Sequence, residues 1–302
     1  MFARALHAGV CRIPFRLSGA ASWCIGNAAH LFLIRDRRRA HSSLLRVFGQ
    51  ERSAREIRSL VRRVFRHSAS VYVEWSILRR WPEPRLRATF PLIAEDLCKL
   101  RAEIASSGSG VVGLTAHLGN WELLSLFFGR FTPGLLVPVA NRIYYPRYHE
   151  FLYRLRIETG LKVLYNDESA RKAIQAIRDG HILGLLPDHE VRTNSSTFVD
   201  FLGLPAQTAT FPVQLARKLQ VKMAMVLLVR DGSTYRVINC GLFDAPHTED
   251  EAEDLRNGTA RWSQMLEVEI RRYPDQWSWT HDRWRSTPDH PRRHLDRGRR
   301  MG

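Results

Sequence analysis

The sequence has little lysine and little cysteine. Five of its 46 basic residues are lysines, and its four cysteines (Cys11, Cys24, Cys98 and Cys240) are scattered, with no C-x-x-C pair. Scattered cysteines argue against a disulfide scaffold and favour a reducing compartment. The G-x-S-x-G motif of a serine nucleophile and the P-loop are also absent. The sequence therefore indicates neither a disulfide-stabilised domain nor either of these two kinds of site.

Positive charge is concentrated near the N-terminus. The formal net charge is +16, and residues 1–66 contribute +11 of it, because they hold fourteen arginines against three acidic residues. Such a region attracts polyanions, either nucleic acid or an anionic bilayer. Nucleic-acid binding would require exposed aromatic residues or a known reading module beside the arginines, and we find neither. The expected partner is an anionic membrane surface and no nucleic acid.

An uncharged stretch runs from Leu17 to Ile34, with Arg16 and Arg35 on either side. Its length is at the lower limit of a membrane span, and two glycines, an asparagine, a histidine and two serines dilute its hydrophobicity. We expect a helix over about residues 15–35 that lies in the membrane interface, with the following arginines at the headgroups. A short membrane span and an ordinary core helix are the alternatives.

The pattern of apolar residues divides the chain into three parts. Residues 1–106 are expected to form a helical, membrane-associating region that includes one long helix over 53–79, which begins at a capping-box pattern. Over 107–285, short apolar strands alternate with helices, which favours an α/β domain with a mostly parallel central sheet covered by helices. Residues 286–302 are basic and are expected to be a disordered tail.

A glycine motif at Gly108-Ser-Gly-Val-Val-Gly113 has the spacing G-x-G-x-x-G. A dinucleotide-binding motif needs a strand before it and a helix that opens within it. Here the glycines follow a predicted helix and lead into a predicted strand over 111–114. We therefore reject a dinucleotide site.

Polar side chains follow three of the predicted strands. His117, Asn141-Arg142 and Asp188 each come just after an apolar strand. In open α/β sheets, ligands bind outside the carboxyl ends of the strands. These side chains are therefore expected to meet at one site.

His117 and Glu122 form an H-x4-E pattern at the first of these strand ends. A neutral imidazole can take the proton of a hydroxyl that attacks an acyl thioester, and a carboxylate can orient the ring and compensate its charge. Residues five apart do not share a helix face, so the two can meet only if the intervening segment turns, which Gly119 permits. We predict that His117 is a general base and that Glu122 orients it, while the following helix offers N–H groups to the developing oxyanion.

Several blocks resemble the lysophospholipid acyltransferase superfamily, and in particular its branch of late lipid A acyltransferases (lauroyl and myristoyl transferases). The resemblance covers about residues 15–285 and rests on these segments: His117-Leu-Gly-Asn-Trp-Glu122, Arg142, Gly184-Leu-Leu-Pro-Asp188, Phe198-Val-Asp-Phe-Leu-Gly203 with Pro205, Thr208 and Thr210, and Tyr273-Pro-Asp-Gln-Trp-Ser-Trp-Thr-His281 with Arg283-Trp284.

The resemblance implies an acyltransferase on the cytoplasmic face of the inner (plasma) membrane. It would move a fatty acyl chain from acyl carrier protein or coenzyme A to a glycolipid hydroxyl, with a lipid A precursor as the expected acceptor. It implies no covalent acyl-enzyme, no metal and no cofactor besides the acyl donor. The alternatives are a different glycolipid or a lysophospholipid as acceptor and, more distantly, a lipid-binding or nucleic-acid-binding protein without activity.

The expected substrate-binding residues are Gly119, Asn120, Arg142 and Asp188. Arg142 would hold a phosphate or the developing charge, and Asp188 would be either a supporting carboxylate or a helix N-cap. The adjacent Asp188, His189 and Glu190 are not expected to bind a metal, because adjacent residues rarely converge on one ion. His189 stands where the family often has glutamine, which leaves the acceptor and the acyl length open.

Overall fold

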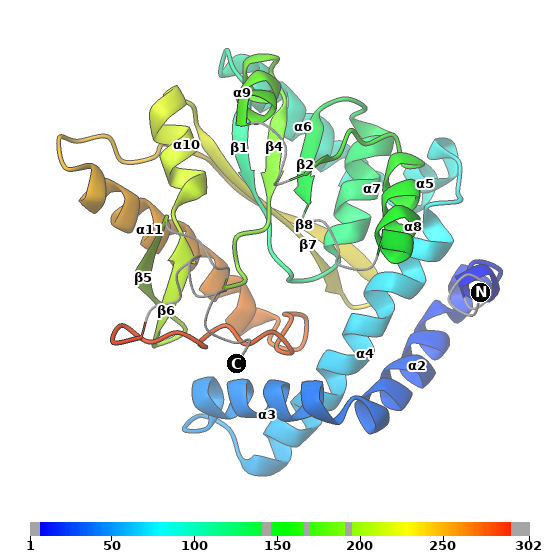
Figure 1. Ribbon diagram of the computed structural model, residues 1–302. Coiled ribbons are helices and arrows are strands. Elements are labelled where there is room, and N and C mark those ends of the chain that lie inside the picture. Colours follow the sequence, from blue (N-terminus) through cyan, green and yellow to red (C-terminus); the bar gives the residue numbers. More distant parts are fainter. Residues whose placement is uncertain (1–6, 141–145, 166–169, 191–194, 291–302) are drawn as a thin grey trace.

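The computed structural model describes residues 7–140, 146–165, 170–190 and 195–290 (Figure 1). Its elements in chain order are η1 (Phe15–Leu17), α2 (Ser18–Phe32), α3 (Ile34–Phe48), α4 (Ala54–Leu78), α5 (Glu83–Thr89), α6 (Pro91–Ser106), β1 (Val111–Leu114), α7 (Trp121–Phe131), β2 (Leu136–Ala140), α8 (Pro146–Ile157), β3 (Leu164–Tyr165), α9 (Ala170–Arg178), β4 (Ile182–Leu185), β5 (Ser196–Phe201), β6 (Leu204–Ala209), α10 (Phe211–Leu219), β7 (Met223–Asp231), β8 (Thr234–Phe243) and α11 (Glu251–Arg272).

A six-stranded sheet forms the centre, with the strand order β3-β2-β4-β1-β7-β8. All neighbouring strands pair in parallel except β7 and β8, which are antiparallel. The carboxyl ends of β1, β2 and β4 therefore lie at the same edge of the sheet. The predicted α/β class with a mostly parallel sheet is confirmed.

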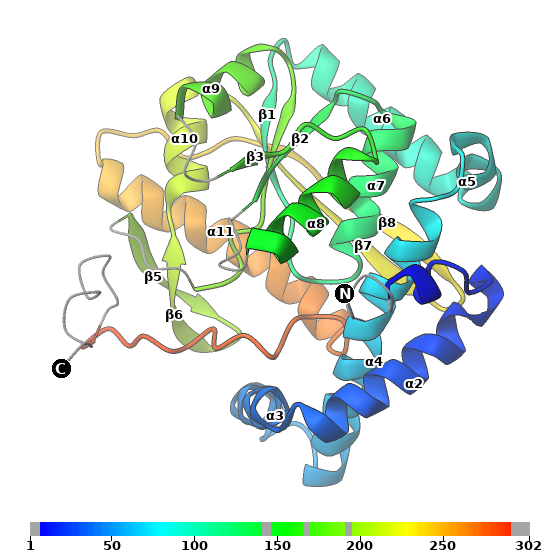
Figure 2. The same cartoon turned by 45° about the vertical axis from the view of Figure 1, so that its right-hand side comes forward.

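Helices cover both faces of this sheet (Figure 2). Successive strand residues point to opposite faces, and in β7 the even positions from Ala224 to Leu228 pack with α6 and α7. The odd positions from Met223 to Val229 pack with α3, α10 and α11 on the other face. Because both faces are buried, the strands are continuous apolar runs.

The N-terminal region is helical, as expected, but its first long helix is broken. α2 and α3 meet at Leu33 and are bent by 94° (Figure 1). In the described part of the chain, no single helix is long and apolar enough to cross a membrane, although the bent pair meets that test by length and composition. The expected interfacial helix over about 15–35 is therefore α2 plus the start of a second helix that turns away.

Helix α4 connects this region to the sheet. Ser53 caps it in the predicted capping box, in which its hydroxyl accepts from the Glu56 N–H and its own N–H donates to the Glu56 carboxylate at 2.8 Å. α2 packs along α4, where a Cβ at Gly26 would lie 2.5 Å from the Arg66 Cα. Glycine at this position therefore allows the two helices to approach closely.

The segment from Ser196 to Leu219 differs from its prediction. The apolar pattern predicts a strand over 197–202, a turn at 203–205 and a helix from Thr208, whereas β5 and β6 form an antiparallel hairpin and α10 begins at Phe211. The turn falls at Leu202-Gly203, both with positive φ, so Pro205 lies within a strand instead of a turn. Pro212 in the first turn of α10 suits a helix start, which explains the later boundary.

Candidate active site

His117 lies in a tight turn, residues 117–120, between β1 and α7. Gly119 adopts a φ of +66°, and a Cβ there would lie 2.0 Å from the carbonyl oxygen of Leu228. The turn therefore requires glycine, as its predicted role in reversing the chain implied. These observations concern only the backbone conformation of Gly119. Its role in substrate binding stays a prediction.

Backbone hydrogen bonds fix this turn from two sides. The Gly119 N–H donates to the carbonyl of Gln276 at 3.0 Å, and the Asn120 N–H donates to the carbonyl of Leu228 at 2.7 Å. The carbonyl of His117 accepts from the Ser278 N–H at 3.0 Å. β7 and the segment 276–278 thus position the turn without using its side chains.

Helix α4 supports the same turn through His67. Its Nε2 lies 2.9 Å from the carbonyl oxygen of Gly119. Burial lowers the pKa of His67 to about 4, against the opposing effect of this hydrogen bond. The ring is therefore neutral at neutral pH, and since a carbonyl can only accept, Nε2 carries the hydrogen and donates it.

Asn120 is fully buried and begins α7. Its side-chain oxygen accepts from the Leu123 N–H at 3.0 Å, which makes it the N-cap of the helix. Its amide nitrogen donates to the Tyr235 hydroxyl at 3.2 Å, and that hydroxyl donates to Glu74 of α4. Asn120 thus has a structural role, and its predicted substrate contact stays a prediction.

The imidazole of His117 is held by Asp188. Nδ1 lies 2.8 Å from Oδ1 of Asp188, and the His117 backbone N–H donates to Oδ2 at 2.9 Å. The indole Nε1–H of Trp277 donates to the same Oδ2 at 3.0 Å. Because a carboxylate accepts hydrogen bonds, Nδ1 is the protonated nitrogen and Nε2 carries the free lone pair.

Asp188 is 1% exposed, and its charge needs these donors. Burial raises the pKa of Asp188, but the attraction of His117 and the hydrogen bonds from His117 and Trp277 outweigh burial and hold that pKa below its ordinary value. Asp188 therefore stays ionised and can compensate a proton on His117. Of the two roles expected for it, the structure shows the supporting carboxylate.

Glu122 has a different partner from the one predicted. It lies in the first turn of α7 at 4% exposure, and its Oε1 accepts from Nη2 of Arg156 at 2.6 Å. Arg156 comes from α8, and although burial opposes its charge, Glu122 raises the pKa of Arg156. Glu122 was predicted to orient His117, whereas the carboxylate that contacts the ring of His117, at Nδ1, is Asp188. A catalytic role of Glu122 stays a prediction.

Two further histidines stack on His117. The rings of His117 and His189 are 3.7 Å apart and those of His189 and His281 are 3.9 Å apart, each pair within 5° of parallel. Donor atoms of His117, Asp188 and His189 lie within 4.8 Å of one another, as in many metal sites. The in-plane lone pairs of two stacked rings lie in parallel planes, however, so they cannot converge on one ion. The expectation of no metal stays a prediction.

The site thus gathers predicted residues and several that the sequence did not indicate. His117 and Asp188 meet as expected from their positions after β1 and β4, while Arg142 lies outside the described residues. Arg156, His67 and His281 were missed, because each lies inside a helix or a loop with no strand-end signal. The block from Tyr273 to Trp284 did mark the supporting segment, although not its contacts.

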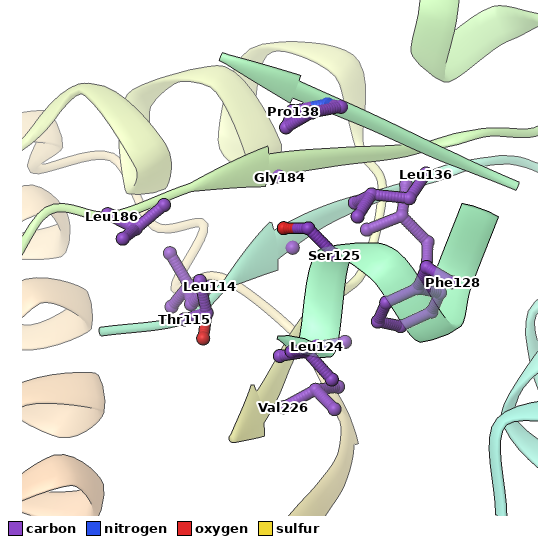
Figure 3. A pocket seen from close by; sticks show the side chains of 13 residues that line it. Leu114, Thr115, Leu124, Ser125, Phe128, Leu136, Pro138, Gly184, Leu186 and Val226 are labelled. Atoms are coloured by element: carbon purple, nitrogen blue, oxygen red, sulfur yellow. The ribbon is translucent and has the colours of Figure 1, made fainter. Parts of the chain in front are cut away.

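An apolar cavity of about 40 Å³ lies between α7 and the sheet (Figure 3). On the helix side Leu124, Ser125 and Phe128 line it. Its floor is a row of small or compact residues in register across four strands, namely Pro138, Gly184, Gly113 and Ala224. One end reaches Thr115 and Leu186, two residues before His117 and Asp188. This end of the cavity therefore lies at the carboxyl edge of the sheet, where His117 and Asp188 follow in the chain.

A parallel sheet with a carboxylate-bound histidine at its carboxyl edge, and an apolar cavity that ends at the same edge, suits an α/β acyltransferase. The sequence comparisons agree with this class. The chain belongs to the bacterial lipid A biosynthesis acyltransferase family, whose description matches residues 2–286.

Three similar proteins from two bacteria carry related names. The chain is 27% identical to the lipid A biosynthesis palmitoleoyltransferase of Escherichia coli (strain K12) over 270 residues, 87% of this chain and 83% of the relative. It is 23% identical to the lipid A biosynthesis lauroyltransferase of the same strain, over 93% of this chain and 89% of the relative. It is also 27% identical to a lipid A biosynthesis acyltransferase of Shigella flexneri, over 87% and 83% respectively.

Proposed function

We propose that this enzyme transfers a fatty acyl chain from an acyl carrier protein or coenzyme A thioester to a hydroxyl group of a lipid A precursor. The observation that carries the proposal is the pairing of His117 with buried Asp188 at the end of an apolar cavity. The family and the names of the similar proteins support lipid A as the class of acceptor. The site is proposed to work at the cytoplasmic face of the inner membrane.

In the proposed reaction, His117 is a general base. Its free Nε2 takes the proton of the acceptor hydroxyl while that oxygen attacks the thioester carbonyl carbon. When the tetrahedral intermediate collapses, the carbon–sulfur bond breaks and the thiolate takes the proton back from His117. Asp188 stabilises the imidazolium between these two steps, as a buried carboxylate does beside a catalytic histidine.

The start of α7 is proposed to stabilise the oxyanion of that intermediate. The first N–H groups of a helix have no acceptor within the helix and carry partial positive charge. Trp121 and Glu122 supply these groups directly after the turn that holds His117. Arg156 adds a positive charge beside them, which its ion pair with Glu122 holds in place.

The apolar cavity is proposed to hold the fatty acyl chain. The residues around it are almost all apolar, as a site for a fatty acyl chain requires, and its volume of about 40 Å³ must grow when a chain enters. Gly184 and Gly113 let neighbouring side chains pack close to the sheet, because a Cβ at Gly184 would lie 2.8 Å from Leu136 Cδ1 and one at Gly113 would lie 2.3 Å from Ile182 Cγ2. A chain in this cavity would place its carbonyl carbon at the end nearest His117.

The corner between α2 and α3, residues 31–34, is proposed to dock on the membrane. Its four apolar side chains are exposed, Phe32 by 80% and Leu31 by 63%. Arginines follow directly at 35, 37, 38 and 39 and would meet anionic headgroups. This docking would bring the site to a lipid acceptor without a helix that crosses the bilayer.

Mass spectrometry of envelope lipids tests the proposed function. Cells that lack this protein should accumulate a lipid A species that is lighter by one fatty acyl group, and expression of the protein should restore the heavier species. The mass difference identifies the acyl chain. An unchanged lipid A profile together with a changed phospholipid profile would contradict lipid A as acceptor, and no lipid change at all would contradict acyl transfer.

A further inference from the structure

The imidazoles of His117, His189 and His281 form a stack, and the proposed reaction uses only His117. His189 is sandwiched between the rings of His117 and His281, and its Nε2 is buried without a hydrogen-bond partner in the described part of the structure. The same holds for Nε2 of His281. Trp121 packs edge-on to His117, with ring centroids 5.0 Å apart. His189 and Trp121 together restrict how the His117 ring can rotate.

The charges around the stack disfavour a proton on His189 or His281 while His117 is charged. Among the described residues, Asp188 is the carboxylate whose side chain bonds to His117, whereas Arg283, with 0% exposure, places a fixed positive charge near His189 and His281. Glu190 accepts hydrogen bonds from Ser286 and acts on Arg283. A second proton on the stack would put two cationic rings face to face at less than 4 Å.

Burial disfavours that second proton further. It lowers the pKa of His189 well below its ordinary value; Asp188 opposes this shift, and the charges of His117, His281 and Arg283 reinforce it. Burial also lowers the pKa of His281. Both rings are therefore neutral at neutral pH, and each presents an electron-rich face to its neighbour.

We propose that the neutral ring of His189 is a positioning residue that holds the His117 ring and stabilises the charged form of that ring during transfer. This rests on the proposed role of His117 as general base. The face of a neutral aromatic ring attracts a cation above it, so His189 favours the imidazolium that forms in the transition state. A charged His189 would oppose that imidazolium.

Substitutions of His189 separate this role from ordinary packing. His189→Phe keeps a flat, neutral ring and should retain kcat within about threefold. His189→Ala removes the ring, so kcat should fall about tenfold while KM for both substrates stays unchanged. His189→Lys places a permanent cation against His117, and kcat should fall about a hundredfold while the acid limb of the pH–rate profile moves to lower pH.

The matched control is His247→Ala, which removes an exposed histidine from the loop before α11 and should leave the kinetics unchanged. Equal losses in His189→Phe and His189→Ala, with wild-type pH profiles in both, would show a packing role only and overturn the proposal. Thermal unfolding of each variant identifies those that do not fold.

Nuclear magnetic resonance of the histidine rings tests the neutral state of His189 without any assay of transfer. The wild-type protein, labelled at histidine and held in detergent micelles, is titrated from about pH 8 to about pH 5. His189 should take up no proton in this range, because burial holds its pKa well below the ordinary value. A proton on His189 would overturn the proposal even if acyl transfer is confirmed. A neutral His189 in an enzyme that transfers no acyl group would overturn the proposed function instead.

Discussion

The catalytic turn at 117–120 and the corner at 31–34 are both short connections, yet they are built in opposite ways. Leu118 and Asn120 in the turn are 0% exposed, and backbone hydrogen bonds hold the turn from two directions. The corner exposes Leu31 by 63% and Phe32 by 80%. The turn is buried and hydrogen-bonded by the rest of the protein. The corner exposes apolar surface that a membrane or a partner would have to cover. Substitutions in the turn should therefore change the rate of acyl transfer, and substitutions in the corner should change membrane binding.

The largest effect is expected at His117. His117→Ala removes the proposed general base, and transfer should fall about a thousandfold. Because the turn is held mainly through its backbone, the fold and the recovery of the protein with membranes should be unchanged. Initial rates with purified protein, alongside a membrane sedimentation assay, check both parts. Full activity in this variant would remove His117 from the mechanism.

Two carboxylates near His117 should differ in their effects. Asp188→Asn removes the charge that supports the imidazolium, so kcat should fall about a hundredfold or more. Glu122→Gln leaves the contact with Nδ1 intact and weakens the pair with Arg156, so it should act less on kcat than Asp188→Asn does. Steady-state kinetics of the two variants decide between them. The reverse order would favour the dyad of His117 and Glu122 predicted from the sequence.

The corner should affect location without affecting the chemistry. Replacement of Leu31 and Phe32 by glutamate should lower binding to anionic vesicles at least about tenfold, because each large apolar side chain contributes about 2 kcal/mol when buried. Activity in detergent micelles should stay within about threefold. The matched control is Leu92→Glu on α6, which is 71% exposed and far along the chain. Equal loss of vesicle binding in the control would contradict a specific role of the corner.

His67 should make stability depend on pH. Its pKa is lowered to about 4 in the folded protein, so the unfolded chain binds the proton more readily. Stability is therefore fully present above about pH 6.5 and falls as the pH drops toward 4, by up to about 3 kcal/mol. His67→Gln should show a smaller loss over this range, measured by urea unfolding at several pH values. An identical pH dependence in the two proteins would contradict a neutral, buried His67.

Much of the fold could be predicted from the sequence, because its elements carry local signals. The capping box at Ser53 and the apolar strands that become β1, β4 and β7 are continuous in the chain. The break at Leu33 was missed because the uncharged stretch continues through it. The hairpin of β5 and β6 was read as a strand and a turn, because its second strand carries Pro205.

The candidate site was predictable only in part. Strand-end position identified His117 and Asp188 because parallel strands bring their carboxyl ends together. The partner of His117 could not be read from spacing, since Asp188 is 71 residues away and reaches it through the sheet. Arg156 and His281 could not be predicted either, because helix packing and a long loop bring them to the site. Sequence spacing thus favoured the nearer carboxylate, Glu122.

The most direct measurement of the central claim is transfer by the purified protein in mixed micelles. An acyl carrier protein or coenzyme A thioester and a lipid A precursor with a free hydroxyl are supplied, and the acceptor is weighed by mass spectrometry. We predict that the wild-type protein adds one fatty acyl group to the acceptor and that His117→Ala adds none above background. An acceptor of unchanged mass with both donors and the wild-type protein would contradict the account.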